Sequence, residues 1–366
     1  MHFIHCKEYD SSNVIGGSVK YAELLDQGLK SNGHQTTTYY RKSIYAGQVA
    51  NKKTSSKNRS HGFYGLILEV IRSWINSNTK VWIVHHPVMG GMSLLARKKK
   101  LIYICHGPWA GEARDISDKY INKKMMSRVR RFIQNLLTNN SNIVFFLSEY
   151  MQKEVSNELN SKANCAQKYR LIPPIAEVSC LDMVGLARQR HRRVSNQIYI
   201  CRRLVKRTGV YDFLEKLALS PYKKNFNIII AGDGPDKGRI KELIDRYSMQ
   251  DCNVLGFVGE DKHKINYLTS EFMLLPSLTN EGFGLVIIEA IHHNCLPIIS
   301  INAGGGAEWM KRTCENLVYD GSIEGIIRCV AYANQNKAEI LGKLRVSVRD
   351  LTKENAASVI ESVTKI

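Results

Sequence analysis

The chain has 366 residues, 44% apolar and 23% charged, and this composition excludes wholesale disorder, collagen-like repeats and low-complexity sequence. At about 150 residues per domain, the length predicts two domains, each with its own core. The net charge of +19 is uneven: residues 1–175 carry 26 basic and 11 acidic side chains, residues 176–366 carry 26 and 22. The first half is therefore expected to face an anionic partner, and charge alone leaves nucleic acid, a phospholipid surface and a phosphorylated substrate as candidates.

Nine scattered cysteines never form a Cys-x-x-Cys pair. This argues against a disulfide scaffold or a zinc site and predicts a reducing compartment. The first residues lack the apolar run of a signal peptide, and no stretch approaches the roughly 18–20 apolar residues of a membrane span. We expect a cytoplasmic protein whose membrane contact is peripheral.

In the first half, short β-branched or aromatic runs alternate with longer amphipathic segments. The expected strands are Met1–Cys6, Gln35–Tyr40, Val81–His85, Leu101–Cys105, Asn142–Leu147 and Tyr169–Ile172. The expected helices are 18–32, 65–76, 119–139 and 149–159. In the first helix, apolar residues recur every three or four positions and so share one face. The polar, basic segment 42–61 is expected to form a mobile loop.

The second half repeats this alternation after a linker expected at 173–180, which opens on two prolines. Its expected strands are Gln197–Cys201, Phe226–Ala231, Asn253–Phe257, Phe272–Leu275 and Leu296–Ser300. Its expected helices lie near 209–219, 235–249, 283–294 and 323–334, and 338–366 also reads as helical. The alternation predicts an α/β protein with two doubly wound parallel-sheet domains.

Ligands of such sheets bind beyond the carboxyl ends of the strands, so the residues after each strand are the candidates for chemistry. Gly16 and Gly17 precede the first helix and could let an anion approach its N-terminus, although an ordinary tight turn explains them equally well. His106, before Gly107, could donate to a substrate hydroxyl, but most lone histidines are structural. His85 follows another strand in the same way.

In the second half, the segment from Arg202 to Gly209 follows the first strand, and its arginines could clamp a pyrophosphate. A solvated basic turn is the alternative. The turn at Gly232, after the next strand, is explained by turn chemistry alone.

The densest signal is the segment 278–290, where a glycine-flanked turn leads from a strand into a helix. Glu281 and Glu289 lie eight residues apart, on the side expected to face a ligand. Carboxylates suit sugar and ribose hydroxyls, and the helix N–H groups suit a phosphate. Glu289 lies among apolar neighbours, so a structural role would require a buried partner. The glycines at 304–306 form a further turn after the last expected strand.

Together these motifs resemble the family 4 glycosyltransferases, which are retaining enzymes of GT-B architecture. The resemblance spans nearly the whole chain in family order. It implies two Rossmann-like domains facing a central cleft: an acceptor-binding domain, residues 1–175, and a nucleotide-sugar-binding domain, residues 176–349. The last helix, about 350–366, would pack back on the first domain. No cofactor or metal is implied, since the nucleotide sugar is a substrate, with a UDP-sugar the expected donor.

Carried over to this sequence, the resemblance assigns catalytic roles to His106, Arg203 and Glu281. His106 would contact the transferring sugar, Arg203 would neutralise the pyrophosphate, and Glu281 would accept donor-sugar hydroxyls. The donor-binding positions, with Gly17 near the phosphates and Glu289 on the ribose, are Gly16, Gly17, Lys206, Arg207, Thr208, Gly232, Phe257, Val258, Gly282, Phe283, Gly284, Leu285 and Glu289.

Thr208 departs from the family pattern, because it stands where the family commonly has lysine. Lys206 or Arg207 could supply the missing charge. The family reacts on one face of the sugar, and the departing phosphate oxygen takes the acceptor proton. Stabilisation of the leaving diphosphate would then be the largest contribution of the protein.

Two basic segments of the first half, Arg97–Lys100 and Lys119–Arg131, predict contact with an anionic membrane surface. In the second segment apolar residues interrupt the charges at helical spacing, which is typical of a helix lying on lipid. A solvated helix face is the alternative interpretation.

The expected function is transfer of a hexose or N-acetylhexosamine to a lipid-linked, lipopolysaccharide or polysaccharide-type acceptor at the inner face of the cytoplasmic membrane. One alternative keeps the fold but uses a soluble acceptor, such as an aminocyclitol or a metabolite. Another is a non-enzymatic nucleic-acid-binding protein, which the charge suggests but which leaves Glu281 and Glu289 unexplained. No nucleic-acid partner is expected.

Overall fold

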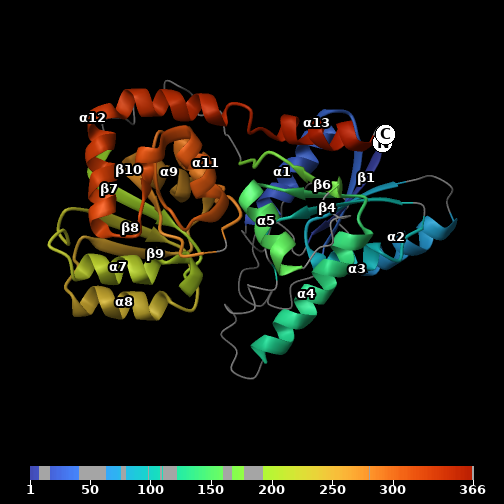
Figure 1. The fold of residues 1–366 in the computed structure, drawn as a ribbon, viewed down its shortest axis with the longest axis horizontal. Coiled ribbons are helices and arrows are strands. Elements are labelled where there is room, and N and C mark those ends of the chain that lie inside the picture. Colours follow the sequence, from blue (N-terminus) through green and yellow to red (C-terminus); the bar gives the residue numbers. More distant parts are fainter. Residues whose placement is uncertain are drawn as a thin grey trace. The chain divides into compact units, whose positions relative to one another are not determined.

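The computed structural model describes residues 1–7, 17–40, 63–75, 80–97, 99–107, 109, 122–159, 167–176, 193–279 and 281–364. These residues form two compact units (Figure 1). The first unit contains the described residues up to Ala176 together with those from Leu351 onward. The second unit contains those from Arg193 to Asp350.

The first unit is built on a six-stranded parallel sheet with the order β2-β1-β3-β4-β5-β6. Its strands are β1 (His2–Lys7), β2 (Gln35–Tyr40), β3 (Lys80–Val84), β4 (Lys99–Cys105), β5 (Ile143–Phe146) and β6 (Tyr169–Leu171). Its helices are α1 (Gly17–Ser31), α2 (Phe63–Ile75), α3 (Pro87–Ser93), α4 (Lys123–Asn140), α5 (Glu149–Glu158) and α13 (Lys353–Thr364).

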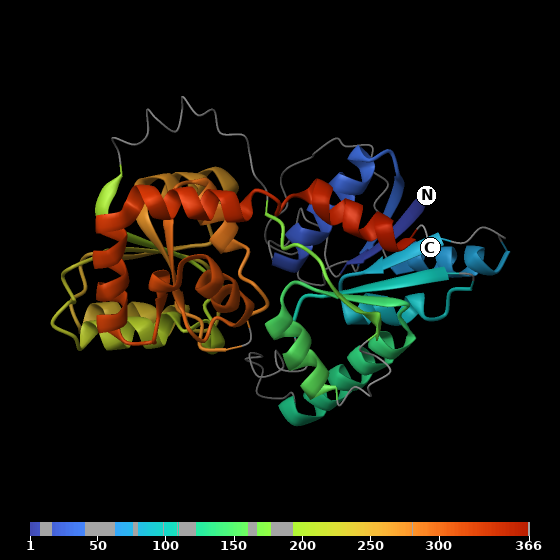
Figure 2. The same cartoon turned by 45° about the horizontal axis from the view of Figure 1, so that its top comes forward.

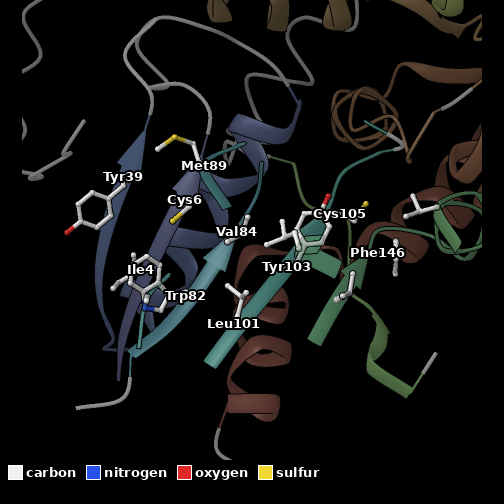
Figure 3. Packing of buried hydrophobic residues seen from close by; sticks show 14 of the residues in the cluster. Ile4, Cys6, Tyr39, Trp82, Val84, Met89, Leu101, Tyr103, Cys105 and Phe146 are labelled. Carbon is white, nitrogen blue, oxygen red and sulfur yellow. The ribbon is translucent and has the colours of Figure 1, made fainter. Parts of the chain in front are cut away.

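Helices α2 to α5 cover one face of this sheet, because their apolar side chains join the same buried cluster. The cluster includes Leu66 of α2, Met89 of α3, Leu137 of α4 and Met151 of α5. Figure 3 shows side chains of this cluster on β1, β3, β4 and β5 pointing toward one side of the sheet. Both faces of a parallel sheet must be buried, so the other face also needs a helical cover.

Helices α1 and α13 lie side by side, with α13 in red and α1 in blue (Figure 2). Gly28 of α1 makes this approach possible, since a Cβ there would lie 2.4 Å from the carbonyl oxygen of Lys353. Asn32 donates to Glu361 Oε1 at 2.6 Å, and Lys100 donates to the carbonyl of Val363 at 2.6 Å. The C-terminal helix is therefore an integral part of the first unit.

The second unit also has a six-stranded parallel sheet, with the order β12-β11-β10-β7-β8-β9. Its strands are β7 (Val194–Cys201), β8 (Asn227–Ala231), β9 (Cys252–Gly256), β10 (Ser270–Leu275), β11 (Leu296–Ser300) and β12 (Val318–Tyr319). Its helices are the short η4 (Lys206–Thr208) and η5 (Glu315–Leu317), and α7 (Val210–Ala218), α8 (Lys237–Arg246), α9 (Glu260–Thr269), α10 (Val286–His292), α11 (Gly304–Cys314) and α12 (Ile323–Val348).

The doubly wound parallel architecture predicted from the sequence is confirmed, and each predicted strand is present within three residues at either end. The sequence did not predict α3, α9, α11 or the short β12. The segment 338–366 is not one helix, since α12 ends at Val348 and α13 begins at Lys353. The expected loop 42–61 and the linker residues 177–180 lie outside the described residues.

Candidate active site

The strand order of each sheet reverses at one point, and ligands of doubly wound proteins bind at the carboxyl ends of the strands there. In the first unit this point lies between β1 and β3, and in the second between β7 and β10. The loops that follow β7 and β10 contain the Arg202 cluster and the Glu281 turn respectively. The topology therefore brings together two motifs that lie about eighty residues apart in the sequence.

Arg202 and Glu281 form an ion pair at the switch point of the second unit, with Nη2 donating to Oε2. Ser277 also donates to Oε2, at 3.4 Å. Burial alone would raise the pKa of Glu281, but the charges of Arg202 and Arg207 and the bond from Ser277 hold it below its ordinary value. The carboxylate is thus ionised and fixed in orientation. The sequence had assigned Arg203, not Arg202, to the site.

In the loop after β7, one side chain is used inside the turn and others are open to solvent. Thr208 is buried, and its hydroxyl donates to the carbonyls of Arg203 at 2.8 Å and Val205 at 2.7 Å. Thr208 thereby closes the η4 turn, which gives a structural reason for an uncharged side chain at this position. Arg203 and Lys206 are exposed and Arg207 is half-buried. The cations of this loop that can meet an anion are therefore Arg203, Lys206 and Arg207.

Two glycines allow the loops at this edge to touch. Gly209 has φ of +71°, and a Cβ there would lie 1.9 Å from the carbonyl oxygen of Pro276, just after β10. Gly232 has φ of +151°, and a Cβ there would lie 1.7 Å from the carbonyl oxygen of Arg202. Both positions exclude other residues through backbone contacts between loops. The absence of a side chain at Gly232 thus has a packing reason.

The turn after β10 is held from both sides. Phe283 is buried and its ring meets that of Trp309 edge-on at 5.7 Å. The N–H of Gly305, in the first turn of α11, donates to the carbonyl of Glu281 at 3.2 Å. Gly284 has φ of +81°, and Leu285 is the N-cap of α10. Gly282 and Leu285 are half-buried, so the turn and the start of α10 are partly accessible at the carboxyl edge of the second sheet.

Glu289 has a buried partner, which the sequence did not reveal. Its Oε2 lies 3.3 Å from His263 Nε2 and accepts from the Tyr267 hydroxyl at 3.2 Å. Burial would lower the pKa of His263, but its contacts with Cys201 and Glu289 raise it to about 9. This ion pair explains how a carboxylate is buried in α10, and it weakens the inference that burial alone marks Glu289 as a ligand residue. His263 lies on α9, a helix that was not predicted.

The remaining predicted residues are Phe257 and Val258 in the second unit, and Gly16, Gly17 and His106 in the first. Phe257 and Val258 follow β9, and the Phe257 ring is 64% exposed. In the first unit, Gly17 is the exposed first residue of α1, and Gly16 lies outside the described residues. His106 follows β4 and is half-buried, and burial lowers its pKa to about 4, so the imidazole is neutral at pH 7.

Within the described ranges, no three His, Cys, Asp or Glu side chains are arranged to hold a metal ion. In the same part of the chain, no helix combines the length and apolar character needed to cross a bilayer. The seven described cysteines are free thiols: Cys6, Cys105, Cys201, Cys252, Cys295, Cys314 and Cys329.

Two Rossmann-like units of this topology define the GT-B fold, and solved structures agree. Sucrose-phosphate synthase from Thermosynechococcus elongatus is 15% identical over 100% of this chain and 98% of that chain, with a TM-score of 0.73. HepE from Anabaena, in complex with UDP and glucose, is 15% identical over all of both chains, with a TM-score of 0.71. WaaG, a glycosyltransferase involved in lipopolysaccharide biosynthesis, is 14% identical over 98% and 99%, with a TM-score of 0.66.

Two models of protein families match the sequence. The model described as Glycosyltransferase Family 4 matches residues 15–177, and that described as Glycosyl transferases group 1 matches residues 187–346. The chain belongs to glycosyltransferase family 4. Curated relatives match it over a shorter stretch. The alpha-monoglucosyldiacylglycerol synthase of Acholeplasma laidlawii is 31% identical over 160 residues, which are 43% of this chain and 39% of that protein.

A human phosphatidylinositol N-acetylglucosaminyltransferase subunit is 30% identical over 165 residues, 43% of this chain and 33% of that protein. The matches therefore span about two fifths or less of the length of these relatives.

Proposed function

We propose that this protein is a retaining glycosyltransferase that moves a hexose or N-acetylhexosamine from a nucleotide sugar to a membrane-lipid or lipid-linked glycan acceptor. The observation that carries the proposal is the ionised Glu281 held by Arg202 at the switch point of the second unit. A fixed carboxylate accepts hydrogen bonds from sugar hydroxyls, and the cations beside it meet a diphosphate.

On this proposal the second unit binds the donor. Arg203 neutralises the pyrophosphate, and the backbone from Phe283 to Leu285 contacts phosphate and sugar. Arg207 takes the place of the usual family lysine, because its charge already acts on Glu281 whereas Thr208 is used inside its own turn. The exposed Phe257 ring stacks on the base. Stabilising the leaving diphosphate electrostatically lowers the barrier, and its oxygen takes the acceptor proton.

The first unit receives the acceptor in this proposal, and His106 contacts the transferring sugar. The names of two curated relatives contain a lipid: one is a synthase of monoglucosyldiacylglycerol, and the other is a phosphatidylinositol N-acetylglucosaminyltransferase subunit. These names support a membrane lipid as the acceptor, and a reaction at the inner face of the cytoplasmic membrane belongs to the same proposal. The solved HepE complex with UDP and glucose supports UDP as the carrier of the donor sugar.

Helix α4 supplies the surface for that membrane. Its apolar stripe, exposed at 42% to 67%, consists of Met125, Val129, Phe132 and Leu136. The spacings of four, three and four place these side chains on one face, away from the buried Gln134 and Leu137. Three exposed cations flank the stripe: Lys124, Arg128 and Arg131. An exposed apolar stripe beside cations is typical of a helix that lies on anionic lipid.

Arg131 also lies 3.8 Å from Glu158, and other cations of the predicted basic segments have local partners too. Arg130 lies over the Trp109 ring at 5.0 Å and donates to its carbonyl at 3.3 Å. Lys99 donates to two carbonyls at the end of α3, and Lys100 donates to Val363. Residues 119–121 lie outside the described part of the chain. The membrane proposal therefore depends on α4.

Reversing the charge of Lys124, Arg128 and Arg131 to glutamate is expected to weaken binding to phosphatidylglycerol vesicles by at least about a hundredfold, since each lost cation contributes roughly 1 kcal/mol at such a surface and each glutamate adds repulsion. Vesicle flotation measures the partition. The matched control reverses Arg239, Lys241 and Arg246 on α8, with the same change of charge but without an exposed apolar stripe. Equal losses in the two variants would return α4 to the solvated-face interpretation.

The donor is tested first with purified protein and UDP-, GDP-, ADP- and dTDP-sugars. We expect one UDP-sugar to raise the melting temperature and to be hydrolysed slowly, because the site binds the diphosphate without the acceptor. Adding diacylglycerol or phosphatidylinositol in vesicles should then convert hydrolysis into transfer. Transfer to an aminocyclitol or another soluble metabolite, with none to lipid, would favour the soluble-acceptor alternative. Salt-sensitive nucleic-acid binding without any donor response would contradict the transferase proposal.

A further inference from the structure

Three histidines of the first unit form a hydrogen-bonded row, which we call the histidine array: His5, His85 and His106. His5 Nδ1 lies 3.2 Å from His85 Nε2, and His85 Nδ1 lies 3.3 Å from His106 Nε2. They belong to neighbouring strands of the sheet, since His5 is in β1, His85 follows β3 and His106 follows β4. The array therefore runs from the interior of the sheet to its carboxyl edge.

The inner end of the array faces a carboxylate. His5 Nε2 lies 3.9 Å from Asp26 Oδ1 on α1, and neither atom has a hydrogen-bond partner elsewhere among the described residues. The other carboxylate oxygen of Asp26 accepts from Lys30 at 2.7 Å. Burial would raise the pKa of Asp26, but His5, Lys30 and the hydroxyl of Thr36 outweigh it and hold the pKa below its ordinary value. Asp26 is thus an anion that points at the first imidazole.

All three imidazoles are neutral at pH 7. Burial lowers the pKa of His5 to about 4 despite the opposing charge of Asp26, and burial lowers that of His106 to about 4. Burial, helped by its histidine neighbours and the charge of Lys7, holds the pKa of His85 well below its usual range. A neutral imidazole donates through one nitrogen and accepts through the other, so two consecutive hydrogen bonds require all three rings to share one direction.

The charge of Asp26 selects that direction. A lone pair on His5 Nε2 would face an anion, whereas an N–H there is attracted by it. With the proton on Nε2, His5 accepts through Nδ1 from His85, and His85 accepts through Nδ1 from His106. We propose that Asp26 fixes the tautomer of His106 through the two intervening histidines, leaving Nδ1 of His106 as the nitrogen that accepts a hydrogen bond from a sugar hydroxyl.

Asp26, His5 and His85 are positioning residues in this account, and the role of His106 toward the sugar rests on the proposed function. Tyr21 keeps the outer ring in place. Its ring meets that of His106 edge-on at 5.2 Å, and its hydroxyl donates to the carbonyl of Pro173 at 3.0 Å. The ring of His106 is thereby held while the array sets its protons.

Asp26→Asn is expected to reverse the array. Lys30 keeps the amide oxygen as its acceptor, so the amide N–H₂ takes the place of Oδ1 and turns its N–H groups toward His5 Nε2, which lies 3.9 Å from Oδ1 in the wild type. An N–H facing Nε2 favours a lone pair there. His5 must then carry its proton on Nδ1, and the change passes along the array until His106 carries its proton on Nδ1. Ring 15N chemical shifts of histidine-labelled full-length protein distinguish the two tautomers. The 15N signals are assigned with variants that each lack one histidine. The measurement needs no nucleotide sugar, no acceptor substrate and no turnover.

The matched control is Glu339→Gln, which removes the acid of an exposed i,i+4 pair with Lys343 on α12. It should leave all three tautomers as in the wild type. Nδ1–H or doubly protonated His106 in the wild type would overturn the proposal, as would an unchanged tautomer in a folded Asp26→Asn protein. If Asp26→Asn does not fold, His85→Phe is measured instead: mixed tautomers at His106 support the relay, and an unchanged Nε2–H form overturns it.

Activity separates this inference from the proposed function. With a working donor, Asp26→Asn should lower kcat/KM roughly tenfold to a hundredfold, because His106 would present a donor to a hydroxyl that needs an acceptor. A protein whose tautomers reverse but which uses no nucleotide sugar would support the relay and contradict the proposed function. Sugar transfer with tautomers that ignore Asp26 would contradict the relay and leave the proposed function standing.

Discussion

Glu281→Gln should lower kcat/KM for sugar transfer by roughly a hundredfold to a thousandfold, the range seen when one fixed electrostatic group of an active site is removed. The amide has nearly the shape of the carboxylate, so the turn held by Phe283 and Gly305 should persist. The variant loses the negative charge that pairs with Arg202, and with it the carboxylate that would accept hydrogen bonds from sugar hydroxyls. Steady-state kinetics with the UDP-sugar identified by the screen measures the effect.

Glu271→Gln is the matched control, because Glu271 is also a largely buried, ion-paired carboxylate associated with β10. It pairs with Lys337 and accepts from the N–H of Asn196 at 3.0 Å, but it lies at the amino end of the strand. We expect both variants to lose unfolding free energy in urea, and only Glu281→Gln to lose transfer. Equal activity of the two variants would remove Glu281 from the active site.

Arg203→Ala is expected to lower kcat/KM by about a hundredfold, since a charge-assisted contact with the leaving diphosphate strengthens as the transition state forms. The side chain is exposed, so the free energy of unfolding should change by less than about 0.5 kcal/mol. The kcat/KM of Arg203→Lys should lie between those of the wild type and Arg203→Ala, because lysine keeps the charge but not the bidentate geometry of arginine. The measurements are donor kinetics and urea unfolding.

Arg246→Ala, an exposed arginine at the end of α8, is the control and should leave both quantities unchanged. Unchanged transfer by Arg203→Ala would assign the diphosphate to Lys206 and Arg207 alone. Arg202→Ala should behave differently, because it leaves Glu281 without the partner that holds it ionised. That variant is expected to lose both stability and transfer. The two adjacent arginines are thus separable by experiment.

The fold could be predicted because its signals are local. Alternating runs of β-branched and amphipathic segments showed the strands, and glycine turns after them marked the ligand edges. The helices α3, α9 and α11 escaped prediction for local reasons too. Helix α3 is seven residues long and includes two glycines, α11 opens on three glycines, and α9 is amphipathic only weakly. Tertiary packing stabilises such helices where intrinsic propensity does not.

The sequence by itself determined the two doubly wound units, the family, and the loops that carry the candidate donor-binding residues. Only the tertiary structure decided which side chains meet: Arg202 with Glu281, His263 with Glu289, and the row from Asp26 to His106. These partners are 79, 26 and up to 80 residues apart. The order of the strands brings β7 beside β10 and β1 beside β3, and it determines which distant side chains meet. The periodicity of the sequence does not reveal this order.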